Sequence, residues 1–164
     1  MEGFVALYEL YYSPMVALAY SVLADIHLAE DAAQEAFAIA CRNLPHLKSK
    51  DKFAAWLAGI CRNVARQMQR SKGKLIALSD PLPAENDNEQ GGHRDTIRRA
   101  VWQLRAVDRE PVVLRYYDNM SYEQIASVLD ISVQAVNGRL IRAKRKIAKY
   151  LKNNGFTGGD YEAP

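Results

Sequence analysis

The chain has 164 residues, a length that suits one domain of average size or two small ones. Hydrophobic residues make up 49% and charged residues 25%, the balance of a globular protein, which excludes a wholly disordered chain and a collagen-like repeat. The apolar stretches are too short to cross a bilayer, the first residues do not form a signal-peptide pattern, and two cysteines are too few for a disulfide framework. We therefore expect a cytoplasmic protein with reduced thiols.

Apolar residues recur at helical spacing through the first part of the chain, and no run shows the sustained alternation of a strand. The first helix is expected over residues 3–26, with a break or kink at Pro14, because proline cannot donate a backbone hydrogen bond. A second helix is predicted from Leu28 to Asn43 and a third from Asp51 to Arg70.

Residues 71–94 differ in composition from what precedes and follows them. They include two prolines, paired glycines and many polar residues, and cannot bury enough apolar surface to offset their ordering entropy. This pattern predicts a flexible linker between a first domain (1–70) and a second domain (95–152), with a disordered tail (153–164). Helical periodicity returns at Thr96, and a further helix is expected to start near Asp108.

Residues 121–151 predict a helix-turn-helix. Ser121 and Gln124 have the spacing of a capping box for a short helix, and Ser132 is a good N-cap for the helix that follows the turn. The second helix repeats apolar residues at steps of four, three, four and four, which form one buried stripe: Val136, Leu140, Ala143, Ile147 and Leu151.

Charge is concentrated in the same part of the chain. Residues 1–70 carry seven basic and seven acidic side chains, whereas residues 95–152 carry twelve basic and six acidic ones. The second helix of a helix-turn-helix enters the major groove, where amide and guanidinium groups read bases and further basic residues meet phosphates. A basic amphipathic helix of a plain bundle remains the alternative, and Ile141 fits either a thymine methyl or the edge of the core.

Both halves of the chain resemble one family. Asp31-Ala-Ala-Gln-Glu-Ala-Phe37 and Phe53-Ala-Ala-Trp-Leu-Ala-Gly-Ile-Cys-Arg-Asn63 resemble region 2 of bacterial sigma factors. Arg115-Tyr-Tyr-Asp-Asn-Met-Ser-Tyr-Glu-Gln-Ile-Ala126 and Val136-Asn-Gly-Arg-Leu-Ile-Arg-Ala143 resemble region 4. Two such regions about a short linker are typical of the extracytoplasmic-function (ECF) group, and the resemblance covers residues 3–151.

The resemblance implies an all-α protein of two small helical domains that brings core RNA polymerase to promoters. Region 2 reads and melts the −10 element, region 4 reads the −35 element, and no covalent chemistry, cofactor or metal is involved. The implied partners are the polymerase β′ clamp helices and β flap, promoter DNA and an anti-sigma factor.

The resemblance also assigns residues to each surface. Core polymerase is expected on one face of the second helix, formed by Asp31, Gln34, Glu35 and Arg42. The −10 DNA is expected on Lys48, Lys50, Lys52, Trp56, Arg62, Asn63 and Arg66. The −35 DNA is expected on Gln134, Asn137, Gly138, Arg139, Ile141, Arg142, Lys144 and Arg145. An ordinary solvated face is the alternative for the polymerase surface, and Trp56 is left open between the core and DNA.

The sequence leaves three other classes of function as alternatives. A stand-alone helix-turn-helix regulator is the main alternative, and the motif at Asp31–Phe37 argues against it. An enzyme is disfavoured because the histidines and cysteines lack zinc-site spacing and no catalytic motif is present. A protein-only adaptor is disfavoured by the basic residues of 139–149. The second helix of the helix-turn-helix differs from the family pattern at Ala135, Asn137 and Gly138. The base sequence that it prefers at the −35 element therefore cannot be taken from relatives.

Overall fold

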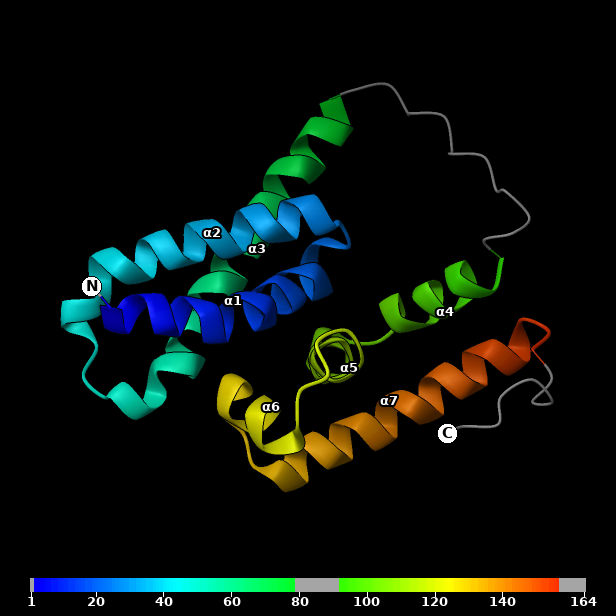
Figure 1. Ribbon diagram of the computed structural model, residues 1–164. Coiled ribbons are helices and arrows are strands. Elements are labelled where there is room, and N and C mark those ends of the chain that lie inside the picture. Colours follow the sequence, from blue (N-terminus) through cyan, green and yellow to red (C-terminus); the bar gives the residue numbers. More distant parts are fainter. Residues whose placement is uncertain (1, 79–91, 157–164) are drawn as a thin grey trace.

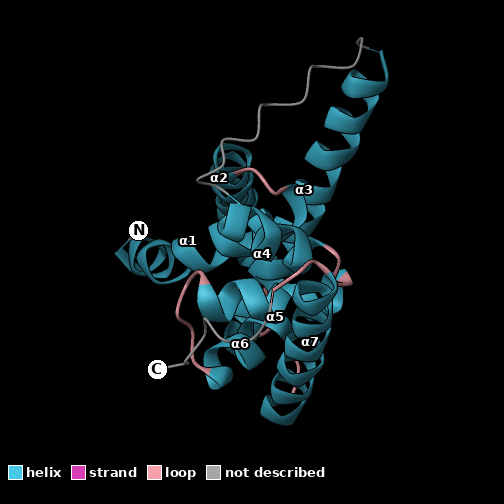
Figure 2. Cartoon of the chain, turned by 90° about the vertical axis from the view of Figure 1, so that its right-hand side faces the viewer, coloured by secondary structure: helices cyan, strands magenta, loops and turns pink. Residues whose placement is uncertain are grey.

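The structure is a computed structural model that describes residues 2–78 and 92–156 (Figure 1). Within those ranges every regular element is a helix, as Figure 2 shows, and the predicted all-α class is confirmed. Residues 79–91 of the predicted linker and residues 157–164 of the predicted tail lie outside the described residues. The helices are α1 (Glu2–Leu23), α2 (Ile26–Asn43), α3 (Phe53–Leu78), α4 (Gly92–Trp102), α5 (Ala106–Tyr116), α6 (Tyr122–Leu129) and α7 (Val133–Asn153), with the 3-10 turns η1 (Leu44–His46) and η2 (Lys50–Lys52) before α3.

Helices α1, α2 and α3 pack on one another and form the N-terminal bundle. The inner face of α2 consists of small side chains that allow close helix approach and are fully buried: Ala29, Ala32, Ala33, Ala36 and Ala40. Phe37 adds bulk to this face and lies 4.7 Å from the Tyr8 ring, centroid to centroid. The Asp25 side chain accepts a hydrogen bond from the Leu28 amide at 3.1 Å, so α2 begins at Ile26, two residues before the predicted start.

Of the break or kink predicted at Pro14, the break is wrong, because α1 runs as one helix from Glu2 to Leu23. A proline inside a helix costs about 3 kcal/mol. The segment that follows it is buried from Met15 to Ala19, and full burial of one large apolar side chain stabilises by about 1.5–3 kcal/mol. Packing of α1 against α2, α3 and α5 therefore outweighs the lost hydrogen bond.

Helix α3 ends eight residues later than predicted, at Leu78 rather than Arg70. No proline lies between Phe53 and Leu78, and the Lys72 ammonium lies 3.6 Å from the Asp25 carboxylate at the start of α2. The change to a more polar composition at residue 71 therefore falls inside α3 and not at its end. The helix starts at Phe53 because the preceding residues form the η2 turn.

Helices α4 to α7 form the C-terminal bundle. Within it α5 packs against α7, and α5 also contacts α1 of the N-terminal bundle (Figure 1). Helix α4 begins at Gly92, earlier than the predicted return of periodicity at Thr96, and α5 begins at Ala106. The core of the C-terminal bundle contains apolar side chains that are less than 10% exposed, among them Leu104, Val112, Val113, Leu114, Ile125, Val128, Leu129, Val136 and Leu140.

Candidate nucleic-acid and polymerase interfaces

The helix-turn-helix is built by local capping interactions. The Ser121 hydroxyl accepts a hydrogen bond from the Gln124 amide at 3.1 Å, and the Gln124 side chain accepts one from the Ser121 amide at 2.8 Å. This is the predicted capping box, and it is confirmed. Asp130 ends α6 in the left-handed conformation (φ 54°), which aspartate tolerates better than most residues. The Ser132 hydroxyl then caps α7 by accepting from the Ala135 amide at 3.1 Å.

Helix α7 has a buried and an exposed face, as its sequence predicts. Val136, Leu140 and Ala143 are at most 1% exposed, whereas Ile147 and Leu151 towards its end are half-buried. Most of the residues predicted to read the −35 element are exposed: Gln134, Asn137, Ile141, Arg142, Lys144 and Arg145. The structure therefore presents amide, apolar and cationic groups together on one accessible helix.

Two cations of α7 are held by one buried carboxylate of α5. Asp108 is 2% exposed, and its oxygens accept hydrogen bonds from Lys146 at 3.0 Å and Arg142 at 3.5 Å. Burial by itself raises the pKa of Asp108, but the nearby cations of Lys146, Arg142 and Arg105 outweigh burial and leave the pKa below its ordinary value. Asp108 therefore holds α7 against α5 and gives Arg142 a partner within the protein.

Arg139 has a hydrogen-bond partner on α5. Pro111 in α5 lacks a backbone N–H, so the carbonyl of Val107 has no intrahelical donor four residues on. The Arg139 guanidinium donates to that carbonyl at 3.4 Å and is half-buried. Gly138 beside it is also half-buried. The predicted roles of these two residues at −35 DNA stay predictions.

Replacement of Asp108 by asparagine is expected to lower the free energy of unfolding of the C-terminal bundle by about 2 kcal/mol at pH 7, because two charge-assisted hydrogen bonds are lost. Since the folded pKa of Asp108 lies below its ordinary value, its contribution is complete above that value and disappears as the pH falls through the folded pKa. Thermal and urea unfolding of both proteins at pH 7 and at lower pH measure the difference. Asp95→Asn, at a carboxylate that is 42% exposed, is the control and is expected to change stability by less than about 0.5 kcal/mol. An Asp108→Asn deficit that stays constant into strong acid would contradict this account.

The four residues predicted to bind core polymerase are all exposed on α2: Asp31, Gln34, Glu35 and Arg42. The Arg42 guanidinium lies 3.5 Å from the Glu35 carboxylate on this surface. The buried alanines lie on the opposite side of the helix, so packing fixes the direction in which this polar surface points.

The residues predicted to bind −10 DNA lie on the η1–η2 segment and along α3. Lys48, Lys50, Asn63 and Arg66 are exposed. Trp56 is half-buried, with its ring 5.9 Å from that of the core residue Phe53, centroid to centroid. Trp56 therefore combines packing with partial access to solvent.

Two of these predicted DNA contacts have protein partners in the C-terminal bundle. Arg62 donates two hydrogen bonds to Glu110, at 2.8 Å and 3.1 Å, and the two side chains are 18% and 9% exposed. The Lys52 ammonium contacts the Asp130 carboxylate in the turn of the helix-turn-helix. The predicted role of Arg62 and Lys52 at −10 DNA stays a prediction, and in this arrangement of the chain both side chains have a partner within the protein.

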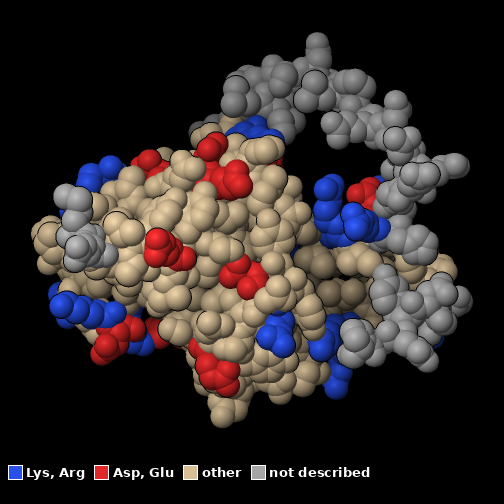
Figure 3. Space-filling view, in the orientation of Figure 1, with Lys and Arg blue, Asp and Glu red and all other residues tan. Residues whose placement is uncertain are grey.

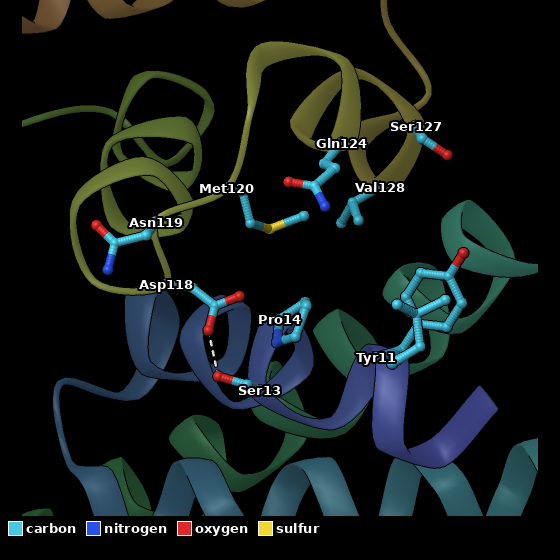
Figure 4. Close-up of a pocket in the computed structure, with 10 residues that line it drawn as sticks. Tyr11, Ser13, Pro14, Asp118, Asn119, Met120, Gln124, Ser127 and Val128 are labelled. Atoms are coloured by element: carbon cyan, nitrogen blue, oxygen red, sulfur yellow. Dashed lines mark hydrogen bonds between the residues drawn. The ribbon is translucent and has the colours of Figure 1, made fainter. Parts of the chain in front are cut away.

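The contact between the bundles also includes aromatic rings and a cavity. Tyr20 of α1 stacks on Tyr117 at 5.5 Å and meets the edge of Trp102 at 5.3 Å, centroid to centroid. Ser13 of α1 donates a hydrogen bond to Asp118 in the loop before α6. Beside this bond lies a cavity of about 390 Å³, lined from one bundle by α1 and from the other by α6 and the loop before it (Figure 4). The two bundles therefore make specific contacts that the sequence did not predict.

The surface shows how the charges are distributed on one side of the molecule. In Figure 3, acidic side chains are spread over α1 and α2, basic side chains lie near the η1–η2 segment and over α4 and α7, and further acidic side chains lie beside these basic ones. In the sequence, the excess of basic residues falls in 95–152. An accessible basic surface attracts a polyanion such as DNA.

Sequence reasoning missed both buried acids of α5. Asp108 interrupts an apolar stripe, because Leu104 and Val112, four residues before and after it, are both buried. A charged residue within such a stripe signals an internal partner, and this signal was available. Glu110 is 7% exposed because of the other bundle, and no local pattern indicates that contact.

No helix in residues 2–78 and 92–156 combines the length and apolar character needed to cross a membrane. Among those same residues, no three His, Cys, Asp or Glu side chains come together as metal ligands.

Comparisons with known proteins place both bundles in one family. Residues 7–75 match the family described as Sigma-70 region 2, and residues 94–147 match the family described as Sigma-70, region 4. The chain is 31% identical to the ECF RNA polymerase sigma-E factor of Escherichia coli, over 71% of this chain and 70% of that protein. It is 29% identical to the RNA polymerase sigma-H factor of Pseudomonas aeruginosa, over 87% of this chain and 82% of that one. It is 27% identical to the ECF sigma factor SigW of Bacillus subtilis, over 93% and 90%.

A solved structure shares the fold. It contains the sigma factor RpoE from Bartonella quintana in complex with the anti-sigma factor NepR, and the similarity has a TM-score of 0.61 at 22% identity, over 93% of this chain and 98% of that one. The helix-turn-helix, the second-helix motif and these matches agree on one family. The chain belongs to the sigma-70 family and is a sigma factor of the ECF type, a protein that directs transcription initiation at promoters.

Proposed function

We propose that the N-terminal and C-terminal bundles divide the work of promoter recognition, with residues 1–70 and 95–152 acting as separate units on either side of residues 71–94. The N-terminal bundle binds core polymerase and the −10 element, and the C-terminal bundle binds the −35 element. The chain acts as a binding protein without enzymatic activity in the bacterial cytoplasm.

Core polymerase binds the exposed face of α2, through Asp31, Gln34, Glu35 and Arg42. Acidic and amide groups on this face complement a basic helical surface, which on the polymerase is the β′ clamp helices. The β flap contacts the C-terminal bundle. The buried alanines on the other side of α2 support this assignment, because they fix the orientation of the polar face.

The −10 element binds along the η1–η2 segment and α3. Lys48, Lys50, Lys52, Arg62 and Arg66 hold the backbone of the melted strand, and Trp56 and Asn63 contact an extruded base. Base extrusion costs a few kcal/mol, which stacking and hydrogen bonds in a protein site offset.

The −35 element binds the exposed face of α7. Gln134 and Asn137 near its N-terminus reach base edges, Ile141 meets a thymine methyl, and the more distal cations meet phosphates. The phosphate contacts are made by Arg139, Arg142, Lys144 and Arg145, and Gly138 permits close approach of the helix to the duplex. The observation that carries the proposal is this exposed face, with Gln134, Asn137 and Ile141 on a helix that buries Val136, Leu140 and Ala143 on its opposite face.

An anti-sigma factor that covers both bundles is a further partner of the chain. The solved structure with the same fold is such a complex, in which the sigma factor RpoE is bound to the anti-sigma factor NepR.

Run-off transcription from a promoter library tests the proposal. Core polymerase is assayed with and without the chain, and the start sites are sequenced. Specific starts that require the chain, with two shared upstream elements, are the expected result. Binding to duplex DNA without polymerase and without specific starts would favour the stand-alone regulator instead.

A further inference from the structure

Asp108 connects the first turn of α5 to α7. Its carboxylate is 2% exposed and accepts hydrogen bonds from Lys146 at 3.0 Å and from Arg142 at 3.5 Å. The side chains of the two cations are about half exposed, at 49% for Lys146 and 56% for Arg142. Asp108 is therefore too enclosed to contact DNA itself, and any effect that it has on DNA passes through one of these two cations.

The Arg142 guanidinium is held over the surface of its own helix. Its Nη2 atom donates to Oδ1 of Asp108, and its Nη1 atom lies 3.6 Å from the point at which a Cβ on Gly138 would stand. Side chains of an α-helix lean towards its N-terminus, so residues four apart are neighbours. The guanidinium therefore lies beside Gly138, at the level of Asn137 rather than at the level of its own Cα.

Lys146 stands in a different place on α7. It lies nine residues beyond Asn137, which is about 14 Å along the helix axis at 1.5 Å per residue. Its ammonium is a point charge without a plane, whereas a guanidinium presents five N–H donors in a rigid fork. Arg142 is thus the partner of Asp108 that lies beside the residues proposed to reach base edges, and the one whose orientation matters.

The hydrogen bond to Asp108 leaves donors of Arg142 for another acceptor. One of the five donors is used by Asp108, and more than half of the arginine side chain remains exposed. Because the guanidinium is planar and rigid, a bond at one edge also sets the direction of the other donors. Asp108 thus presents Arg142 to a duplex in a fixed orientation.

A fixed cation and a free cation act differently on DNA. A free side chain follows the phosphates of any sequence and so supports non-specific binding. A side chain that is already held in its bound orientation loses less conformational entropy on binding, but it fits only a duplex that lies in the matching register. The second behaviour increases the difference in affinity between the right and the wrong sequence.

From these observations we propose that Asp108 is a positioning residue for recognition of the −35 element, which holds Arg142 in the orientation that fits the duplex when the first turns of α7 lie at the base edges. The inference rests on the proposed role of the C-terminal bundle at the −35 element. It adds a residue that contacts no DNA and yet sets selectivity, because Asp108 acts through the guanidinium of Arg142.

Selectivity is measured as a ratio of two transcription yields. Core polymerase with the full chain transcribes a promoter recovered from the promoter library and, in a separate reaction, the same promoter with its upstream element scrambled. Asp108→Asn is expected to lower the ratio of the two yields roughly tenfold, the effect of one well-placed charge-assisted hydrogen bond. The assay is run at a temperature at which circular dichroism shows every variant to be folded, so that loss of stability does not enter the ratio.

Two further substitutions separate the orientation of Arg142 from its charge and from the attachment of α7 to α5. Arg142→Lys keeps the charge and leaves Asp108 its bond with Lys146, but removes the planar fork, and is expected to lower the ratio as far as Asp108→Asn does. Lys146→Gln removes the other partner of Asp108 and is expected to keep the ratio of the unmodified chain. In the Arg142→Lys background, Asp108→Asn is expected to have no further effect.

Leu140→Ala is the control for stability. Leu140 is 1% exposed and takes no part in the hydrogen bonds of Asp108, so its truncation weakens the C-terminal bundle without altering those bonds. Its ratio is expected to equal that of the unmodified chain while the protein is folded. Arg142→Lys covers the case in which Asp108→Asn does not fold, because it leaves the buried carboxylate paired with Lys146.

The outcomes distinguish the two proposals. A ratio of one for the unmodified chain would overturn the proposed role of α7 at the −35 element and the positioning role with it. A high ratio that Asp108→Asn or Arg142→Lys leaves unchanged would overturn the positioning role alone. An equal fall for Lys146→Gln or Leu140→Ala would also overturn it, because selectivity would then follow the attachment of α7 rather than the orientation of Arg142.

Discussion

Leu140→Ala is expected to lower the free energy of unfolding of the C-terminal bundle by about 3 kcal/mol, because it leaves a cavity in a packed core. Leu140 is 1% exposed and lies on the buried face of α7, next to Val136 and Ala143. Urea unfolding followed by circular dichroism measures the loss. At physiological temperature the recognition helix loses its support, so −35-dependent transcription falls with stability.

The neighbouring substitution Ile141→Ala is the matched control. Ile141 is 42% exposed on the opposite face of the same helix, so its truncation is expected to change stability by less than about 0.5 kcal/mol. If it meets DNA as proposed, promoter binding weakens by about 1 kcal/mol, in the range of one base-pair mismatch. Equal losses of stability in the two variants would contradict the assignment of the two faces.

Asp31→Arg is expected to reduce specific run-off transcription at least tenfold while leaving the fold intact. The side chain is exposed on the α2 face proposed to bind core polymerase, and the substitution places a cation where the proposed partner surface is basic. Like charges placed opposite each other in an interface cost several kcal/mol. Affinity for core polymerase, measured by anisotropy of a labelled chain, is expected to fall in parallel with transcription.

Glu9→Arg controls for the change in net charge. Glu9 is an exposed acid of α1, outside the proposed polymerase face. This variant is expected to retain polymerase binding and transcription. A loss of activity shared equally by both variants would point to overall charge rather than to the α2 face.

Local chemistry made much of the fold predictable. The first residues of α6 and α7 could be predicted from N-capping side chains, which are those of Ser121, Gln124 and Ser132. The structure has each of these capping hydrogen bonds. The buried stripe of α7 follows in the same way from spacing alone. The candidate −35 face could be predicted because it is simply the side of α7 that this stripe leaves exposed.

The errors came from contacts between distant parts of the chain. Pro14 was expected to break or kink α1, but burial of the segment after it by three other helices keeps α1 from breaking there. The ion pair of Arg62 was not foreseen, because its partner Glu110 lies 48 residues further along the chain, in another bundle. No periodicity or capping pattern reports such a contact, because it depends on how two already folded units meet.

The two cysteines allow the central claim to be tested directly. Cys41 is exposed, whereas burial raises the pKa of Cys61 to about 12 and keeps it an unreactive thiol at neutral pH. In a Cys41→Ser background, a single new cysteine at Gln67 of α3 or at Glu123 of α6 therefore carries an iron chelate that cuts nearby DNA. Both positions are exposed and lie outside the residues proposed to contact DNA.

The measurement is hydroxyl-radical cleavage of promoter DNA in the complex with core polymerase, mapped separately for the two probes. The account predicts cuts around the −10 element from position 67 and cuts about 25 base pairs upstream, around the −35 element, from position 123, both only when polymerase is present. Cuts from both probes at one place on the DNA, or the same cuts without polymerase, would contradict the claim that this chain is a sigma factor whose two bundles separate to read two promoter elements.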